Sequence, residues 1–315
     1  MCAAMFPEYS NHLLYLVKRY GLPVLYCLLL AGFFLLFKKW GLIPLLLLLV
    51  PVYGLLIFLA VVGQKLLIYC PVREIQSTPA DLQLRYEAVQ LNTPDGETLH
   101  AWFIPGDQNQ PVVLFCHGNN SNISSPSHLK FLELLHSLGL STIIFDYRGF
   151  GRSTGSPDQA GTYRDAEVVW KHLVQSRRYT GRDIIIWGKS LGGGPASYLA
   201  SKHQNCRALV LEATFTSVPD VARRMFPFLP VTWIIRHEYP VHRHVSKVDS
   251  PILVMHSPAD ETIPYRLGRR VFEAAREPKK FVQLSGGHVW GFWTSKETCV
   301  QAIQENLLNR QERKS

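Results

Sequence analysis

A serine between two glycines is the residue whose type and setting most directly suggest chemistry. Ser190 is the centre of a Gly-x-Ser-x-Gly pentapeptide that runs from Gly188 to Gly192. A short β-branched run precedes it and a helix-like stretch follows at residues 195–200, which is the strand–turn–helix setting of a nucleophile elbow. The tight turn leaves no room for bulky neighbours, which accounts for both glycines. A glycine-rich turn that merely contains a serine would look the same, so the interpretation depends on partners.

A serine hydroxyl is a weak nucleophile and needs a base, for which His288 is the candidate. This histidine, one of twelve, lies in a Gly-Gly-His loop between the expected last strand and last helix. Asp260 follows an expected strand and is the candidate acid, able to hold the tautomer of His288 and to stabilise its imidazolium form. The same aspartate could instead cap the helix that follows it. Glu261 and Glu212 are the alternative acids.

An acyl-transfer site also needs two donors for the oxyanion. The backbone N–H of Leu191, directly after the serine, is the first. The His-Gly-Asn-Asn loop at residues 117–120 follows another expected strand, and its Asn119 backbone N–H is the expected second donor. Loss of one such donor costs about 3–4 kcal/mol of transition-state stabilisation. His117 could act as a base, but its position favours a role in bracing the loop.

These residues would be positioned by an alternation of strands and helices. We expect strands at residues 85–91, 98–104, 112–116, 141–145, 183–187, 209–212, 251–256 and 281–284. We expect helices at residues 129–138, 163–176, 195–200, 265–276 and 296–309. This rhythm predicts an α/β fold with a mainly parallel sheet covered by helices on both faces. The loops that carry the serine, the acid and the base then meet at one edge of the sheet.

The motifs in combination resemble the α/β-hydrolase superfamily, in particular its membrane-anchored α/β-hydrolase-domain (ABHD-type) serine hydrolases. The resemblance covers residues 85–310 and includes the Asp-Tyr-Arg-Gly-Phe-Gly-Arg-Ser segment at 146–153, where Arg148 would brace the loops. The chain order of serine, aspartate and histidine is that of the family. Members include lipases, esterases and protein-depalmitoylating thioesterases. The resemblance implies an α/β-hydrolase fold and a catalytic set of Ser190, Asp260 and His288, with Asn119 and Leu191 as oxyanion donors.

The amino-terminal part differs in composition from the rest. Two runs without charge, residues 20–37 and 41–63, are separated by a short basic stretch. About 20 helical residues cross a bilayer, so the second run is long enough and the first is at the lower limit. We therefore expect a membrane anchor of one or two helices at residues 1–66 and a catalytic domain at 67–315; a buried hairpin of a soluble protein is the alternative.

The side of the membrane on which the domain lies depends on the number of spans. With two spans, the positive-inside rule places both the amino terminus and the main domain in the cytoplasm, and with one span it places the domain outside. We favour two spans, although the family commonly has a single anchor. Asn119 and Asn122 begin N-glycosylation sequons inside the expected oxyanion loop, where a glycan would obstruct the cleft. In a eukaryotic protein, that position argues against a lumenal domain; in a bacterial protein it carries no information.

Composition narrows the other classes. The net charge is +9, but the basic residues are scattered, which argues against binding to nucleic acid. A basic balance beside an apolar anchor is typical of contact with anionic lipid headgroups. The six cysteines lie far apart and form no CxxC pair. No P-loop or dinucleotide fingerprint is present, and a His-rich stretch at residues 237–244 lacks zinc-helix spacing, so we expect it to be a solvated loop. We accordingly expect no metal and no cofactor.

The expected substrate follows from apolar residues near the site. A short cap at residues 213–248 contains Phe228 and Trp233, and Trp290 lies beside the base; these could line an acyl-binding wall or simply pack the cap. We expect hydrolysis of an ester or thioester with an apolar acyl chain presented from the bilayer, so the expected partners are a lipid or acyl-ester substrate and the membrane. A serine peptidase, an acyltransferase and a non-catalytic membrane scaffold stay open, as does the oligomeric state.

Overall fold

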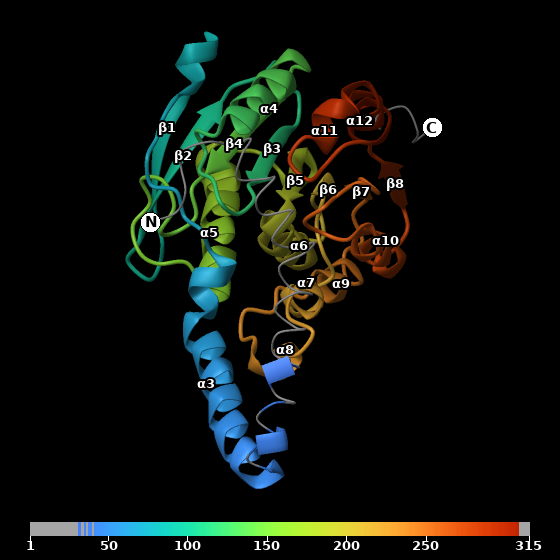
Figure 1. Ribbon diagram of the computed structural model, residues 1–315. Helices are drawn as coiled ribbons and strands as arrows, with labels where there is room; N and C mark the ends of the chain where they lie inside the picture. The colour runs from blue at the N-terminus through green and yellow to red at the C-terminus, as the bar shows by residue number, and fades with distance from the viewer. Residues whose placement is uncertain (1–30, 33–34, 36, 40, 309–315) are drawn as a thin grey trace. The chain divides into compact units, whose positions relative to one another are not determined.

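The central element is an eight-stranded sheet, and all eight predicted strands are present in it. The computed structural model describes residues 31–32, 35, 37–39 and 41–308 (Figure 1). The strand order is β1-β2-β4-β3-β5-β6-β7-β8. Their bounds are β1 Glu87–Asn92, β2 Thr98–Ile104, β3 Val112–Cys116, β4 Ser141–Phe145, β5 Ile184–Lys189, β6 Ala208–Glu212, β7 Ile252–His256 and β8 Lys279–Gln283. Only β2 runs antiparallel to its neighbours, β1 and β4; the pairs from β4 to β8 are parallel, so the predicted mostly parallel α/β fold is confirmed.

Helices cover both faces of the sheet because its central strands are apolar on both sides. In β5, Ile184 and Ile186 belong to one buried cluster, whereas Ile185 and Trp187 belong to the other. Continuous apolar strands of this kind are typical of parallel sheets. The first cluster is packed by α5 Gln159–Lys171, α6 Gly193–Lys202, α9 Val241–Val245 and α10 Tyr265–Ala274. The second is packed by α4 Pro126–Ser137, α11 Gly291–Thr294 and α12 Lys296–Ile303.

The cap between β6 and β7 is more structured than expected. It contains α7 Val218–Met225 and α8 Val231–Ile234 before α9, grouped at one end of the sheet unit (Figure 1). The expectation of a solvated loop at residues 237–244 is wrong for the second half of the stretch. Residues 237–240 lie outside any helix or strand, but His244 lies in α9, hydrogen-bonds Ser197 (Nδ1···Oγ 3.1 Å) and packs edge-on against Tyr198. Burial lowers the pKa of His244 to about 4. Pro240 caps the start of α9.

The apolar helix before the sheet is α3, Leu42–Ile68. Its stretch Leu46–Ile68 has a mean hydropathy of 2.7, and it is the one helix in the described part of the chain that is long and apolar enough to cross a membrane. The expected first span, residues 20–37, falls almost entirely outside the described residues. By their internal contacts, residues 1–62 and 63–315 form two separate units, so the last turn of α3 belongs to the sheet unit.

Candidate active site

The turn after β5 has the geometry of a nucleophile elbow. Ser190 has a φ of +52°, a left-handed conformation that a side-chain-bearing residue seldom adopts. A Cβ on Gly188 would lie 2.6 Å from the Cβ of Ala196, and one on Gly192 would overlap the carbonyl oxygen of Cys116. The glycines therefore allow β5, the turn and α6 to pack closely enough to project the serine from the edge of the sheet.

The structure brings Ser190, His288 and Asp260 into one hydrogen-bonded chain. His288 Nε2 lies 3.0 Å from Ser190 Oγ, and His288 Nδ1 lies 2.8 Å from Asp260 Oδ2. The tautomer that fits donates from Nδ1 to the carboxylate and accepts the serine hydroxyl proton at Nε2. The side chain of Asp260 is buried and that of His288 is 12% exposed, so the histidine faces the solvent-accessible side.

Asp260 is held by more donors than the sequence suggested. Burial alone would raise its pKa, but hydrogen bonds from His256 and His288 outweigh burial and keep the pKa well below its usual value. The backbone N–H groups of Thr262 and Ile263 donate to Oδ1 at 2.9 and 2.7 Å. The aspartate is thus an ionised acceptor, fixed in orientation by its own loop.

His256 is a residue that the sequence analysis missed. It ends β7, is fully buried and lies with Nε2 3.2 Å from Asp260 Oδ2 and 3.0 Å from the carbonyl oxygen of Ile263. Nε2–H therefore donates to the same carboxylate oxygen that accepts from His288. The signal in the sequence is its place at the end of a strand, four residues before the acid.

The two alternative acids are engaged elsewhere. Glu212 forms an ion pair with Lys189 at 2.7 Å and accepts a hydrogen bond from the Trp187 indole N–H at 3.3 Å. Glu261 accepts from the backbone N–H of His288 at 3.0 Å and so fixes the loop, not the ring. Of the three carboxylates, Asp260 is the one hydrogen-bonded to the imidazole.

The loop expected to supply the second oxyanion donor lies beside the serine. A Cβ on Gly118 would be 3.4 Å from the Cβ of Ser190. No described group accepts a hydrogen bond from the backbone N–H of Asn119, which leaves that donor available. His117 is buried, and burial lowers its pKa, so its neutral ring donates from Nδ1 to the carbonyl oxygen of Gly118 (2.7 Å) and braces the loop. The oxyanion roles of Asn119 and Leu191 stay predictions.

The Asn119 side chain ties this loop to the segment that follows α3. Nδ2 donates to the carbonyl oxygen of Ile68 at 2.6 Å, and Oδ1 accepts from the backbone N–H of Cys70 at 2.8 Å. Asn122, two per cent exposed, repeats the pattern: its Nδ2 donates to the carbonyl oxygens of Val72 (3.2 Å) and Glu74 (2.5 Å). The backbone of residues 68–74 thus holds the side chains of the candidate oxyanion loop in place.

The three expected substrate contacts are on the surface. Phe228 and Trp233 belong to the cap and are 58% and 88% exposed, while Trp290 follows the base loop and is half-exposed. Side chains this exposed do not form the wall of a closed pocket in this structure. Their contact with substrate stays a prediction.

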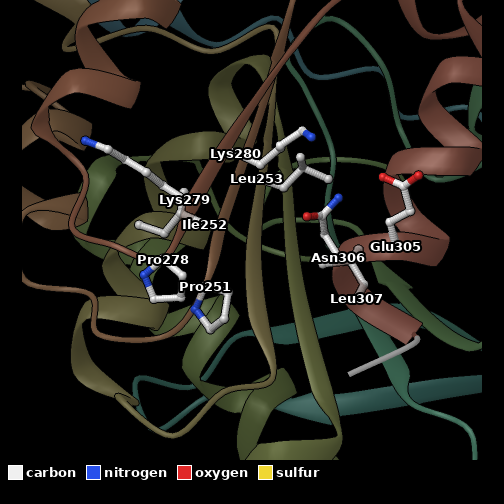
Figure 2. Close-up of a pocket in the computed structure, with 9 residues that line it drawn as sticks. All are labelled: Pro251, Ile252, Leu253, Pro278, Lys279, Lys280, Glu305, Asn306 and Leu307. Atoms are coloured by element: carbon white, nitrogen blue, oxygen red, sulfur yellow. The ribbon is translucent and has the colours of Figure 1, made fainter. Parts of the chain in front are cut away.

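One hollow lies away from this edge of the sheet. Figure 2 shows it, with a volume of about 220 Å³, between the first residues of β7 and β8 and residues 305–307; Ile252, Lys279 and Asn306 are among the residues that line it. It opens at the amino ends of these parallel strands, whereas Asp260 and His288 follow their carboxyl ends. Among the described residues, no group of three or more His, Cys, Asp or Glu side chains is arranged to hold a metal ion.

Comparison with known proteins supports the fold described above. A family model described as the alpha/beta hydrolase fold matches residues 111–234. A Mycobacterium tuberculosis protein is 33% identical over 228 residues, which cover 71% of this chain and 80% of that protein. The alpha/beta hydrolase domain-containing protein WAV2 of Arabidopsis thaliana is 30% identical over 261 residues, covering 75% and 84% of the two chains.

Solved structures show the same fold at low sequence identity. The esterase Pf2001 of Pyrococcus furiosus superposes with a TM-score of 0.64 at 20% identity, covering 75% of this chain and 95% of that one. Est1E of Butyrivibrio proteoclasticus, solved with ferulic acid, gives a TM-score of 0.59, also at 20% identity, over 70% and 99%. At this identity the likeness concerns the fold.

Proposed function

This chain belongs to the α/β-hydrolase superfamily, and we propose that it is a serine hydrolase that cleaves ester or thioester bonds of substrates with an apolar acyl group. The observation that carries the proposal is the unbroken hydrogen-bonded chain from Ser190 through His288 to Asp260 on an elbow turn. Such a chain supplies the nucleophile, the base and the group that orients the base.

The mechanism follows from these positions. Ser190 Oγ attacks the acyl carbonyl carbon while His288 Nε2 takes the hydroxyl proton, and Asp260 stabilises the imidazolium. The oxyanion accepts from the backbone N–H groups of Leu191 and Asn119. His288 then protonates the leaving alcohol or thiol, which leaves an acyl-enzyme, and water resolves the acyl-enzyme by the same route.

The preference for an apolar, membrane-resident acyl group is supported by α3 and by the exposed apolar residues of the cap, Phe228 and Trp233. The names of structural neighbours describe esterases, and for this chain esterase activity is a proposal. None of these steps requires a metal or a cofactor.

We further propose that α3 anchors the chain and that the catalytic domain faces the cytoplasm. Supporting this orientation, the side chain of Asn122 is buried and uses both of its polar atoms within the fold. A glycan added to this sequon during translocation would exclude these contacts. A domain that never meets the glycosylation machinery avoids that conflict.

The test is hydrolysis of a series of acyl esters and matched thioesters, from acetyl to palmitoyl, by the full chain in lipid nanodiscs. We expect rates to rise with acyl length and the Ser190→Ala variant to lose at least about a thousand-fold in kcat. A preference for acetyl over all longer chains would contradict the substrate proposal. Undiminished turnover by Ser190→Ala would contradict the mechanism.

The remaining classes have their own outcomes in the same assay. Cleavage of amides without cleavage of esters would identify a peptidase. Acyl transfer to an added alcohol in preference to water would identify an acyltransferase. A folded protein inactive on every substrate would favour a scaffold.

A further inference from the structure

A single polar side chain joins the end of the apolar helix to the cap. Gln64 lies in the last part of α3 and is only 6% exposed. Its Oε1 accepts from the backbone N–H of Arg236 at 2.8 Å, and its Nε2 lies 3.4 Å from the carbonyl oxygen of Ile234. Because both contacts are to backbone atoms, they fix the position of the chain after α8, not merely one side chain.

The cap segment held in this way exposes large apolar side chains. Trp233, Phe228 and Met225 are each more than half exposed, and Trp233 reaches 88%. All three lie within residues 225–233, where α7 ends and α8 follows, and the two helices pack together. Clustered exposed apolar residues of this size are typical of an interaction surface.

Basic residues flank this apolar segment in the chain. Arg224 and Arg236 are exposed, and within the described chain neither forms an ion pair with a carboxylate. Lys65 is half-exposed, and its ammonium group forms a long ion pair of 3.9 Å with Asp158. A hollow of about 540 Å³ is lined by Lys65, Arg236 and His237, and Asp158, which also lines it, partly neutralises their positive charge. Glu238 is exposed nearby, and Asp220 is paired with Arg223, so the free charge is predominantly positive.

The depth of this segment follows from its link to α3. Gln64 is four residues before the end of the apolar stretch Leu46–Ile68, a rise of only ~6 Å along the helix. A helix of this length that crosses a bilayer places its last turn at the headgroup level. Residues bound to Gln64 then lie at that level too.

We propose that residues 225–236, together with Lys65, form a second membrane contact that docks the cap on the bilayer surface. Trp233 is seated at the boundary between headgroups and acyl chains, where tryptophan is enriched. Arg224, Arg236 and Lys65 face anionic headgroups. The occupant of this surface is thus the lipid bilayer in which α3 is anchored.

Docking would bring the candidate site close to bilayer lipids. At the other end of the cap, Thr214 Oγ1 donates to the carbonyl oxygen of Ser190 at 2.9 Å, so the cap runs from the serine to the proposed membrane contact. The docking itself does not depend on catalysis. It can be measured on the Ser190→Ala variant, so its failure is distinct from failure of the proposed activity.

The experiment is quenching of tryptophan emission by lipids brominated near the headgroup end of the acyl chains. The full chain and its Trp233→Phe variant are placed in nanodiscs of brominated or ordinary phosphatidylcholine containing phosphatidylserine. The difference in emission between the two proteins reports Trp233 alone. We expect brominated lipid to remove roughly half of this difference or more, as for a side chain at the acyl boundary. An equally bright difference in both lipids would overturn the proposal.

Two further variants make the result specific. Trp102 is buried in β2, and the emission lost in Trp102→Phe should be equal in both lipids. Gln64→Leu removes the link to the cap and should weaken quenching of Trp233, while Arg224→Glu with Arg236→Glu should do so in phosphatidylserine. Quenching that is indifferent to both changes would mean that neither the link nor the charge directs the surface to the bilayer.

Discussion

Asp260 accepts hydrogen bonds from two histidines at the same carboxylate oxygen, Oδ2. His288 is 2.8 Å away and His256 3.2 Å away. A donor on a carboxylate lowers its basicity, so His256 weakens the hold of Asp260 on the protonated form of His288. His256 is therefore a positioning residue that sets how readily His288 acts as a base.

This role predicts a shift in the pH profile. The His256→Phe variant should raise the acidic limb of kcat/KM by roughly half a pH unit, because a more basic Asp260 stabilises the imidazolium. It should also lower kcat several-fold, because Asp260 loses a donor that holds its carboxylate in position toward His288. His256→Gln, which keeps an N–H donor, should lie closer to the wild type. An acidic limb that stays in place in His256→Phe, with the protein folded, would reduce His256 to a packing role.

Individual site residues could be predicted from the sequence where a local motif and the chain order identify them. Ser190, Asp260 and His288 were proposed from an elbow and two loops, and the structure brings them together. His256 was missed because its place at the end of a strand, four residues before the acid, does not by itself show that its ring reaches the carboxylate of Asp260. The catalytic roles themselves stay predictions.

At the scale of elements, the loop beside the serine depends on the segment after α3. Asn119 uses its whole amide group on the backbone of Ile68 and Cys70. We predict that Asn119→Ala lowers kcat about ten-fold or more with little change in KM, because a displaced backbone donor weakens oxyanion binding more than substrate binding.

The matched control for that prediction is Ser121→Ala in the same loop, whose hydroxyl makes only a 3.5 Å contact with the carbonyl oxygen of Gly118. It should keep the kcat of the wild type. Equal kcat in both variants would show that the tie to Ile68 and Cys70 does not set the position of the oxyanion donors.

Elements were predictable where periodicity was strong. The buried strands of the parallel sheet are continuous apolar runs, and each was placed within a few residues. Helices α7, α8 and α9 were not predicted, because eight, four and five residues are too few to establish a helical period. The tie between Gln64 and the cap joins residues about 170 positions apart, which sequence spacing cannot indicate.

For the whole molecule, buried histidines predict acid sensitivity. Burial lowers the pKa of His128 to about 3 and that of His244 to about 4, below the ordinary value of 6.5. Below pH 6.5 the unfolded chain therefore binds protons that the folded chain does not. Down to about pH 4, the free energy of unfolding should fall by about 1.4 kcal/mol per pH unit for each of the two histidines; above pH 6.5 they cause no change.

Pulse proteolysis of the detergent-solubilised chain across pH 4–8 measures this dependence. The His244→Asn variant should show a shallower fall between pH 6.5 and 4 than the wild type, since it lacks one of the buried histidines whose pKa is lowered. An unchanged slope would mean that His244 is protonated in the folded state.

The central claim is that Ser190 is an activated nucleophile, and labelling with a fluorophosphonate tests it most directly. The full chain in nanodiscs is treated with the probe beside Ser190→Ala and Asp260→Asn, and the labelled peptide is identified by mass spectrometry. We predict rapid labelling at Ser190 in the wild type, none in Ser190→Ala and labelling slowed by orders of magnitude in Asp260→Asn. A folded wild-type protein that is not labelled, or is labelled at another residue, would contradict the account.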